Sequence, residues 1–317
     1  MENTTLVPLA QNKQGKNMIS INDIQIKTIS ENTAATPLIM AEWGLSMEIK
    51  LNNQKILFDT GAGNINVLRH NMMVMQVEPS QISSIILSHA HQDHTGGLRY
   101  FLSQRAYQTS DSIPIYCHPK TLQPTYVKSP MNNTYRFFGC PFSVEEIRRY
   151  NAEFSVSNDP IEIDGTSVMT SGEIPMINDY ESVGFNFFNK NNDDYQLDTE
   201  MIDDLALFIQ TNRGLVIILG CAHRGMINTI HHAQKVTGID DIYMVVGGTH
   251  LANAPKDRMD QTIAEIKRLN INKVGVSHCT GLTSGAYLQK ELGTDIFFNN
   301  NAGSIIRFEN DALDINQ

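Results

Sequence analysis

Residues 85–98 read IILSHAHQDHTGGL, and this stretch decides the fold class. A short apolar strand, predicted at Ser84–Leu87, runs into three histidines and one aspartate within six residues: His89, His91, Asp93 and His94. Two glycines and a helix predicted at about residues 94–104 follow. Imidazole and carboxylate groups are suitable ligands for zinc, iron or manganese. Because an abrupt strand-to-helix turn lets alternating side chains diverge, we expect them to reach two adjacent metal ions.

Three later strands are predicted to bring further histidines to the same place. The apolar runs near Ile218, Val245 and Val276 each end in small residues that are followed by a histidine. We expect these histidines to project from the sheet edge that also presents His89; they are His223, His250 and His278. Ligands from strands far apart in the sequence can surround two ions, which a single helix or loop cannot do.

The run at 85–98 resembles the signature of the metallo-β-lactamase-fold metallohydrolases, and residues 58–61, FDTG, resemble the Asp-Thr-Gly that ends a strand in that family. Four further stretches resemble the subfamily that includes the archaeal dihydropterin synthase of methanopterin biosynthesis: SGEIP at 171–175, LGCAHRG at 219–225, GGTHL at 247–251 and SHCTG at 277–281. The resemblance covers most of residues 24–308. It implies an α/β fold, a four-layer αββα sandwich with the metal site at the strand edges between the two sheets.

The resemblance also implies a division of the metal ligands. His89 and His91 would hold one metal ion, and Asp93 and His94 would hold the other. His278 would complete the second site.

The chain departs from the wider superfamily at the strand predicted at Leu215–Leu219. Members of the superfamily generally supply one more histidine to the first metal and a bridging aspartate from the end of a later strand. Here Cys221 follows the strand, and His223 lies two residues beyond it. Either Cys221 bridges the metals as a thiolate, or it is a buried bystander while His223 supplies the imidazole. We favour His223 as a ligand and leave the role of Cys221 open.

Three other residues are candidates for supporting roles. We expect Asp59 to hydrogen-bond a metal-bound histidine and fix its turn, with a plain Asx turn as the alternative. His250 is expected to contact substrate or to orient a ligand. His118 could line the cleft, although a structural role is favoured for it.

Composition narrows the class of protein. The chain has 317 residues, 41% of them hydrophobic and 18% charged, so it has material for a large core and is not a disordered chain. Its net charge is −10 and its 24 Lys and Arg are scattered, so no nucleic-acid partner is expected. No run of about 18 apolar residues occurs, which argues against a membrane partner. Four cysteines and the lack of a visible secretory signal suggest a cytoplasmic protein. The oligomeric state is left open.

Strand and helix patterns alternate along the chain and predict one domain. Strands are expected at Ile24–Ser30, Leu45–Leu51, Lys55–Phe58, Leu205–Gln210, Leu215–Leu219, Ile242–Val246 and Lys273–Val276, and helices near Ile65–Met75, Met226–Val236, Met259–Leu269 and Ala286–Leu292. Residues 1–22 read as a tail before a domain at 23–317. Residues 119–160 and 174–201 lack a sustained period and are expected to be long loops or a lid at the border of a site.

Metal-assisted hydrolysis is the expected chemistry. Two divalent cations that share a water lower its pKa to near neutrality, and Asp93 can both bind a metal and accept a hydrogen bond from that hydroxide. We expect zinc, with iron or manganese as alternatives, and a small anionic or ester or phosphoester substrate. Competing hypotheses are a transferase that displaces pyrophosphate, like the dihydropterin synthase, an iron-bound redox protein, and a metal or ligand sensor.

Overall fold

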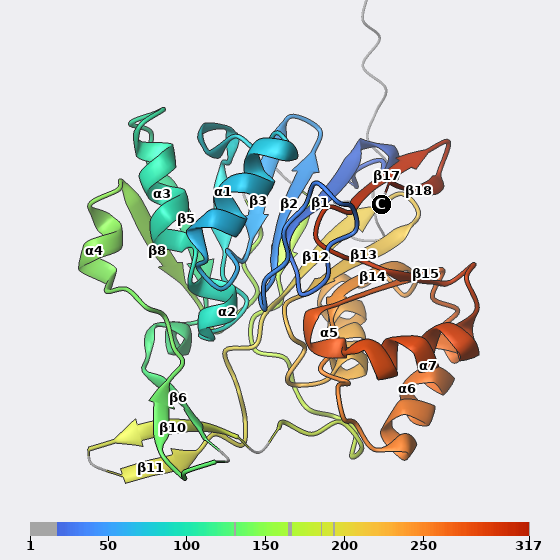
Figure 1. The fold of residues 1–317 in the computed structure, drawn as a ribbon. Helices are drawn as coiled ribbons and strands as arrows, with labels where there is room; N and C mark the ends of the chain where they lie inside the picture. Colours follow the sequence, from blue (N-terminus) through green and yellow to red (C-terminus); the bar gives the residue numbers. More distant parts are fainter. Residues whose placement is uncertain (1–17, 130, 164–166, 185, 193, 317) are drawn as a thin grey trace, which may run out of the picture.

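The computed structural model describes residues 18–129, 131–163, 167–184, 186–192 and 194–316. Two large sheets pack face to face, and helices cover the outer face of each (Figure 1). One sheet has eight strands in the order β18-β17-β1-β2-β3-β4-β5-β8, and the other has six in the order β16-β15-β14-β13-β12-β9. The expected αββα sandwich is confirmed.

The eight-stranded sheet is built mainly by the first half of the chain. Its strands are β1 (Ile24–Ser30), β2 (Ser46–Leu51), β3 (Gln54–Phe58), β4 (Ser84–Ile86), β5 (Ile113–Cys117), β8 (Ala152–Val156), β17 (Ile305–Glu309) and β18 (Ala312–Asn316). The helices α1 (Ile65–Val74), α3 (Leu98–Ala106) and α4 (Val144–Arg148) belong to its outer layer (Figure 1). Short 3₁₀ turns lie at Ile21–Asp23, Pro79–Gln81 and Pro119–Leu122.

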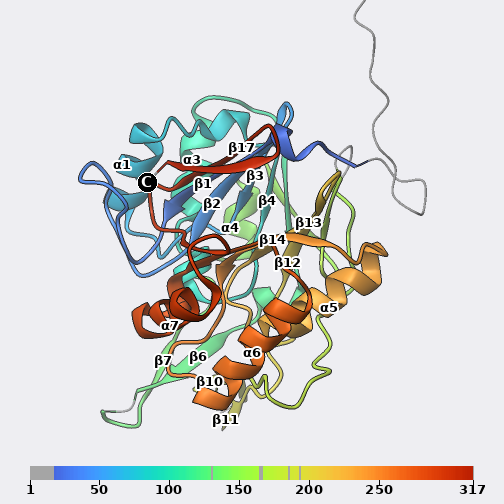
Figure 2. The same cartoon turned by 90° about the vertical axis from the view of Figure 1, so that its right-hand side faces the viewer.

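The six-stranded sheet contains the parallel strands of the second half. Its strands are β9 (Val168–Thr170), β12 (Ala206–Thr211), β13 (Gly214–Leu219), β14 (Ile242–Gly248), β15 (Lys273–Ser277) and β16 (Phe297–Asn299). Strands β13 to β16 run parallel, so the ends of β13, β14 and β15 meet at one edge, as predicted. The helices α5 (Met226–Thr237), α6 (Lys256–Arg268) and α7 (Leu282–Leu292) cover this sheet (Figure 2).

One of the hydrophobic cores lies between the two sheets. Phe58 and Ile49 of the first sheet share a buried cluster with Ile209, Ile218 and Val246 of the second. All six residues of β13 are buried, because the strand has a sheet on one face and helices on the other. This explains why its sequence, GLVIIL, is a continuous apolar run rather than an alternating one.

The helix predicted at 94–104 is in fact two helices, α2 (Gln92–Thr95) and α3, separated by Gly96 and Gly97. The chain breaks here because the backbone approaches the loop after β3. A Cβ atom on Gly97 would lie 2.0 Å from the carbonyl oxygen of Thr60, so only glycine fits.

The prediction of long irregular loops at 119–160 and 174–201 is wrong in part. The two segments pair with each other as a small sheet of four strands, β11-β10-β6-β7, which stands off from the sandwich (Figure 1). Its strands are β6 (Thr125–Lys128), β7 (Tyr135–Phe137), β10 (Phe187–Asn191) and β11 (Asp194–Leu197). The stacked rings of Tyr135 and Tyr195, 3.8 Å apart, help to join strands that lie far apart in the sequence.

Of the expected tail at residues 1–22, residues 1–17 lie outside the described residues. Beyond that point the chain is already part of the fold: Ile19 donates its N–H to the carbonyl of Gln210, and Ile21 is buried. In the described part of the chain, no helix is both long enough and apolar enough to cross a lipid bilayer.

Candidate metal centre

The loop after β4 and the loop after β13 bring three imidazoles together. Nε2 of His89 lies 2.9 Å from Nδ1 of His91 and 3.3 Å from Nε2 of His223. The other ring nitrogen of His89, Nδ1, lies 2.8 Å from the hydroxyl of Ser88. All three histidines are buried. Three ring nitrogens therefore converge on one point, as the sequence predicted for His89, His91 and His223.

A second group forms beside the first. Nε2 of His94 lies 3.3 Å from Nε2 of His278 and 3.1 Å from Sγ of Cys221. The other nitrogen of His94 is held by the carboxylate of Asp59 at 2.6 Å, and the other nitrogen of His278 by the amide oxygen of Asn32 at 2.9 Å. Side chains from α2 and from the segments that directly follow β3, β13 and β15 thus meet at a single edge.

Cys221 belongs to both groups. The ligand atoms of His89, Cys221 and His223 all lie within 4.8 Å of one another, and so do those of His94, Cys221 and His278. The sulfur is buried in the centre of the cluster. This position, shared by the two halves, is the one that a bridging ligand would need.

In the second group, Nε2 of His94 and Nε2 of His278 face each other. A carboxylate or an amide oxygen can only accept, so Asp59 and Asn32 require N–H groups on Nδ1 of His94 and of His278. When these rings are neutral, both Nε2 atoms are acceptors, and a cation between them would remove the repulsion of their lone pairs. Oδ1 of Asp93 is buried and lacks a hydrogen-bond partner among the described residues. These features fit bound metal ions.

The ionisation of the cluster is consistent with metal binding. Burial lowers the pKa of His89, His91 and His223, in the case of His91 to about 3, so these rings are neutral and can bind a cation. Burial alone would also lower the pKa of His94, but the charge and hydrogen bond of Asp59 raise it to about 9. A cation that binds Nε2 of His94 would therefore take the place of a proton. Burial raises the pKa of the Cys221 thiol, so an adjacent cation would be needed to release its proton.

Asp93 lies at the side of the second group. Its Oδ2 atom accepts a hydrogen bond from the indole N–H of Trp43 at 3.0 Å and lies 3.4 Å from Nε2 of His278. Burial would raise the pKa of Asp93, but the adjacent His278 and the other nearby imidazoles lower it overall. The carboxylate is therefore ionised, with one oxygen oriented by Trp43.

Asp59 has the supporting role expected for it. Its two oxygens accept hydrogen bonds from the backbone N–H and the hydroxyl of Ser88, in addition to the contact with His94. It therefore orients His94 directly and His89 through Ser88. Its backbone has a positive φ of 56°, and Ala222 and His278 also have positive φ at the ends of their strands. Such backbone conformations are costly for residues other than glycine and are common at functional sites.

The other two predicted residues lie outside the two groups. His250 packs against His223 with 4.3 Å between the ring centroids, and burial lowers its pKa to about 4. Both nitrogens of His118 have protein partners, the side chain of Glu173 and the backbone N–H of Lys120. The structural role favoured for His118 therefore agrees with its contacts.

Several residues of the site carried no recognisable sequence pattern. Asp203 accepts the backbone N–H of Ala90, between two histidines, and Asp204 accepts the backbone N–H of Arg224, next to His223. These two buried aspartates hold the loops that carry His89, His91 and His223. In the sequence, the only signal for Asp203 and Asp204 is that two aspartates follow each other after an irregular segment.

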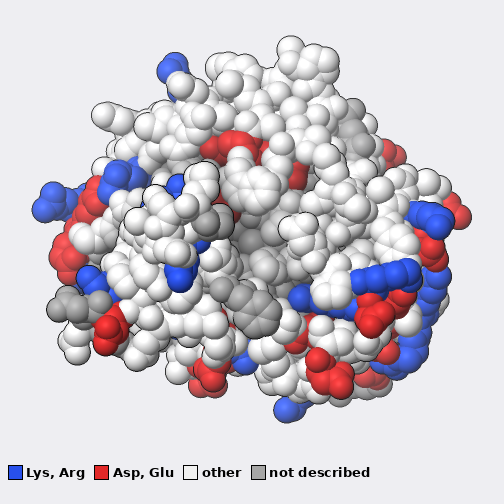
Figure 3. Space-filling view, turned by 60° about the horizontal axis from the view of Figure 1, so that its bottom comes forward, with Lys and Arg blue, Asp and Glu red and all other residues white. Residues whose placement is uncertain are grey.

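Aromatic rings from the small sheet border the first group. Phe187 lies 4.1 Å from His91 between ring centroids, and Phe138 lies 5.2 Å from it. Segments 119–160 and 174–201 therefore border the site, as expected, although by way of a sheet. Figure 3 shows this end of the molecule, which is hollowed near its centre, with acidic side chains above the hollow and basic ones on either side.

Comparison with solved structures supports the fold. A metal-dependent hydrolase of the β-lactamase superfamily matches 89% of this chain and 98% of its own, with a TM-score of 0.72 and 24% identity. Zinc-bound PqqB from Methylobacterium extorquens matches 89% of this chain and 99% of its own, with a TM-score of 0.52 and 11% identity.

Sequence comparison decides the family. The chain is 31% identical to a 7,8-dihydropterin-6-methyl-4-(β-D-ribofuranosyl)-aminobenzene-5'-phosphate synthase from Methanocaldococcus jannaschii, over 92% of this chain and 99% of the synthase. A family model described as anti-Pycsar protein Apyc1 matches residues 36–237. The chain belongs to the family that the Apyc1 model describes. The predicted resemblance to the synthase subfamily is confirmed, and the solved structures show that the fold is that of the metallo-β-lactamases.

The chain shares the fold of these solved structures. Its buried imidazole, thiol and carboxylate groups are of the kinds that bind zinc in proteins.

Proposed function

We propose that the protein is a hydrolase with two metal ions that acts on an ester or phosphoester bond of a small molecule. The observation that carries the proposal is the position of Cys221, whose sulfur belongs to two groups of buried ligands at once. His89, His91 and His223 would hold one ion, and Asp93, His94 and His278 the other, with Cys221 between them. Two divalent cations would supply Lewis acidity to the bond that breaks and to a water molecule.

The residues around the ligands prepare the site for this chemistry. Asp59 and Asn32 fix the tautomers of His94 and His278, so that both Nε2 lone pairs face inward. Trp43 holds one oxygen of Asp93, and the other oxygen could bind a metal ion and accept a hydrogen bond from the attacking water. Phe138 and Phe187 shield His91 from bulk water, which strengthens the electrostatic interactions inside.

The test compares the metal-free protein with protein reconstituted with zinc, manganese or iron. Each form is assayed with a phosphodiester, a lactone, a thioester and a β-lactam. We expect hydrolysis of a phosphodiester or another ester only in the reconstituted protein, and its loss in the double variant His89→Ala, His91→Ala. A reconstituted protein that binds metal but hydrolyses none of these bonds would contradict the proposal.

A second candidate is a synthase reaction, because the synthase from Methanocaldococcus jannaschii aligns along nearly its whole length with this chain. The same ligands would then assist displacement of pyrophosphate as a pterin and an arylamine are joined. Pyrophosphate released only when both substrates are supplied would favour this candidate. Product formed from a single substrate and water would favour the hydrolase.

A further inference from the structure

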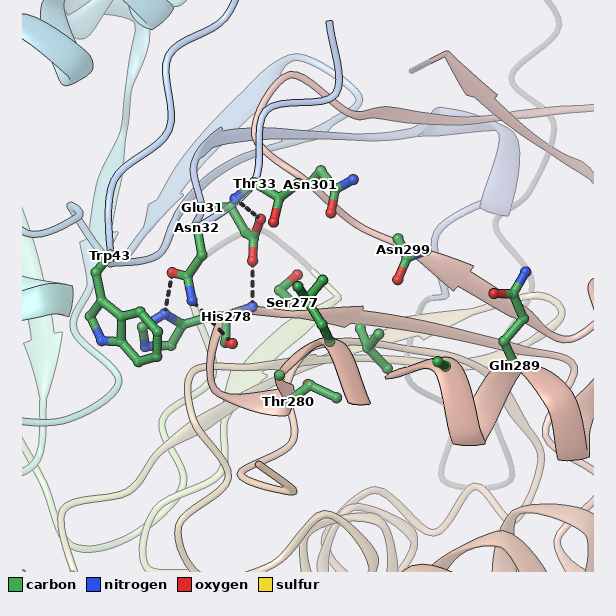
Figure 4. Close-up of a pocket in the computed structure, with 14 residues that line it drawn as sticks. Glu31, Asn32, Thr33, Trp43, Ser277, His278, Thr280, Gln289, Asn299 and Asn301 are labelled. Carbon is green, nitrogen blue, oxygen red and sulfur yellow. Dashed lines mark hydrogen bonds between the residues drawn. The ribbon is translucent and has the colours of Figure 1, made fainter. Parts of the chain in front are cut away.

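The charges around the two ligand groups are distributed unevenly. Beside the second group lies a groove of about 470 Å³, and none of the described residues that line it is Lys or Arg. Its one carboxylic side chain, Glu31, accepts the backbone N–H of His278 at 2.6 Å (Figure 4). The carboxylate of Asp93 lies on the same side, 3.4 Å from Nε2 of His278. The described residues of this groove therefore offer no cation to an anionic group of a substrate.

Arg258 is a buried cation whose hydrogen-bonding capacity is mostly unused. It lies in the first turn of α6, and the residue is only 8% exposed. Its Nη1 atom donates to the carbonyl of Ser182 at 3.1 Å, whereas Nε and Nη2 are buried without a hydrogen-bond partner. A guanidinium is always charged in proteins, and buried donors that remain unsatisfied are costly. Arg258 is therefore suited to bind an acceptor that the protein itself does not supply.

The charge of Arg258 has no ion-pair partner among the described residues. Burial lowers the pKa of its guanidinium, and the carboxylate that acts most strongly against this effect is that of Glu181. The oxygens of Glu181 are already engaged, since they accept hydrogen bonds from the side chain of Asn178 and from the backbone N–H groups of Ile227 and Asn228. A buried charge without a partner is destabilising, so an anion bound to Arg258 would relieve this cost.

His250 links this charge to the first ligand group. Its ring lies 4.3 Å from the ring of His223 between centroids, and burial followed by the charge of Arg258 lowers its pKa. Neither ring nitrogen of His250 is hydrogen-bonded to another described residue. A Cβ atom on Gly184 would lie 3.2 Å from Cε1 of His250, so a larger residue there would crowd the ring edge between the two nitrogens. The unused donors of Arg258 and the open ring edge of His250 thus occur together beside His223.

We propose that Arg258 and His250 form a subsite for an oxyanion, a carboxylate or a phosphate, that the substrate carries in addition to the bond that reacts. The oxygens of either group accept hydrogen bonds from the planar fork of a guanidinium. The proposal rests on the proposed function only in assigning the oxyanion to the substrate. The metal ions act on the bond that breaks, and Arg258 selects molecules that have a second negative group near His223.

The test measures the binding of inorganic phosphate and of acetate to the full-length, metal-reconstituted protein by isothermal titration calorimetry. The two anions distinguish a phosphate from a carboxylate as the source of the oxyanion. Because metal ions also bind anions, each titration is repeated with the metal-free protein. Arg258→Met removes the charge and the donors but keeps a long side chain, and Arg258→Lys keeps the charge. Lys267→Met, at an exposed position of the same helix, is the matched control for the loss of one positive charge.

We expect at least one of the two anions to bind saturably to the wild type, with and without metal. Arg258→Met should bind that anion about tenfold more weakly in both forms, because hydrogen bonds from a charged group are lost. Arg258→Lys should be affected less, and Lys267→Met should bind as the wild type does.

No saturable binding to the metal-free wild type, unchanged affinity in Arg258→Met, or equal weakening in Arg258→Met and in either of the other two variants would overturn the proposal. Hydrolysis together with anion binding that does not depend on Arg258 would refute the subsite alone. Anion binding that depends on Arg258 in a protein without hydrolytic activity would refute the proposed function alone.

Discussion

Nε2 of His94 and Nε2 of His278 face each other at 3.3 Å, and the opposite nitrogen of each ring is bound to an oxygen that can only accept a hydrogen bond. The His94 ring comes from α2, which follows β4 of the first sheet, and the His278 ring comes directly after β15 of the second sheet. The arrangement therefore spans the interface between the two halves of the sandwich. A cation between the nitrogens would remove the repulsion of their lone pairs and join the halves.

Replacement of Asp93 by Asn should reduce turnover more than stability. The amide keeps the shape but loses the negative charge, and with it the capacity to accept a proton and much of the attraction for a cation. We expect kcat to fall about 100-fold or more, with the metal content measured in the same samples. Trp43→Phe, which removes only the hydrogen bond to Oδ2, should cost less. Full metal content with unchanged kcat in Asp93→Asn would rule out this role.

Asp59→Asn should weaken metal binding, although Asp59 is not itself expected to bind a metal. Both of its oxygens are already hydrogen-bonded, to Ser88 and to His94. Loss of the carboxylate leaves His94 without its charged partner and disturbs Ser88, which contacts His89. A partner of a ligand is typically worth about 10–100-fold in metal affinity, and we expect a loss in that range in a competition titration with a chelator. Asp295→Asn, at an exposed position, is the control. Equal affinity in both variants would show that Asp59 only shapes its turn.

Glu181→Gln should lower stability without a change in metal content. The buried carboxylate of Glu181 accepts the backbone N–H groups of Ile227 and Asn228 at the start of α5 and so attaches the segment before β10 to that helix. Loss of the charge at a helix N-terminus should cost about 1–2 kcal/mol, measured by denaturant unfolding. Glu153→Gln, at an exposed position of β8, should have little effect. Identical unfolding curves for the two variants would contradict the capping role.

The two cysteines near the centre should differ in their response to cobalt. If Cys221 binds metal, the cobalt-substituted protein will show a thiolate charge-transfer band that Cys221→Ser abolishes. Cys279 lies beside it, with its sulfur 3.4 Å from the Cys221 carbonyl, but it belongs to neither ligand group. Cys279→Ser should keep the band. A band that survives in Cys221→Ser would make this cysteine a packing residue.

Much of the fold could be predicted from local patterns. The strands β1 and β13 and the helix α5 were predicted within a residue or two, because a buried strand or an amphipathic helix leaves a clear period in the sequence. The small sheet could not be predicted in this way. Its strands are only three to five residues long, and β6 pairs with β10 across some 60 residues of chain, a contact that no local period records.

The same distinction applies to the site. His89, His223 and His278 could be found because each follows an apolar strand, and the structure brings them together. Trp43 and Asn32 could not, since they lie on a loop with no regular pattern and reach the site only through the packing of the two sheets. For Cys221 the sequence leaves two alternatives, a bridging thiolate or a buried bystander. Its position beside both ligand groups could not be predicted, because His278 of the second group comes from the far end of the chain.

The metal content of the purified protein after reconstitution tests the central claim most directly. We predict about two ions per chain in the wild type, and about one ion in each of the variants His223→Ala and His278→Ala, which remove one ligand from each group. The variant His118→Ala, a buried histidine outside both groups, should keep the wild-type ratio. No bound metal in the wild type, or the same ratio in all three variants, would contradict a centre with two metal ions at these residues.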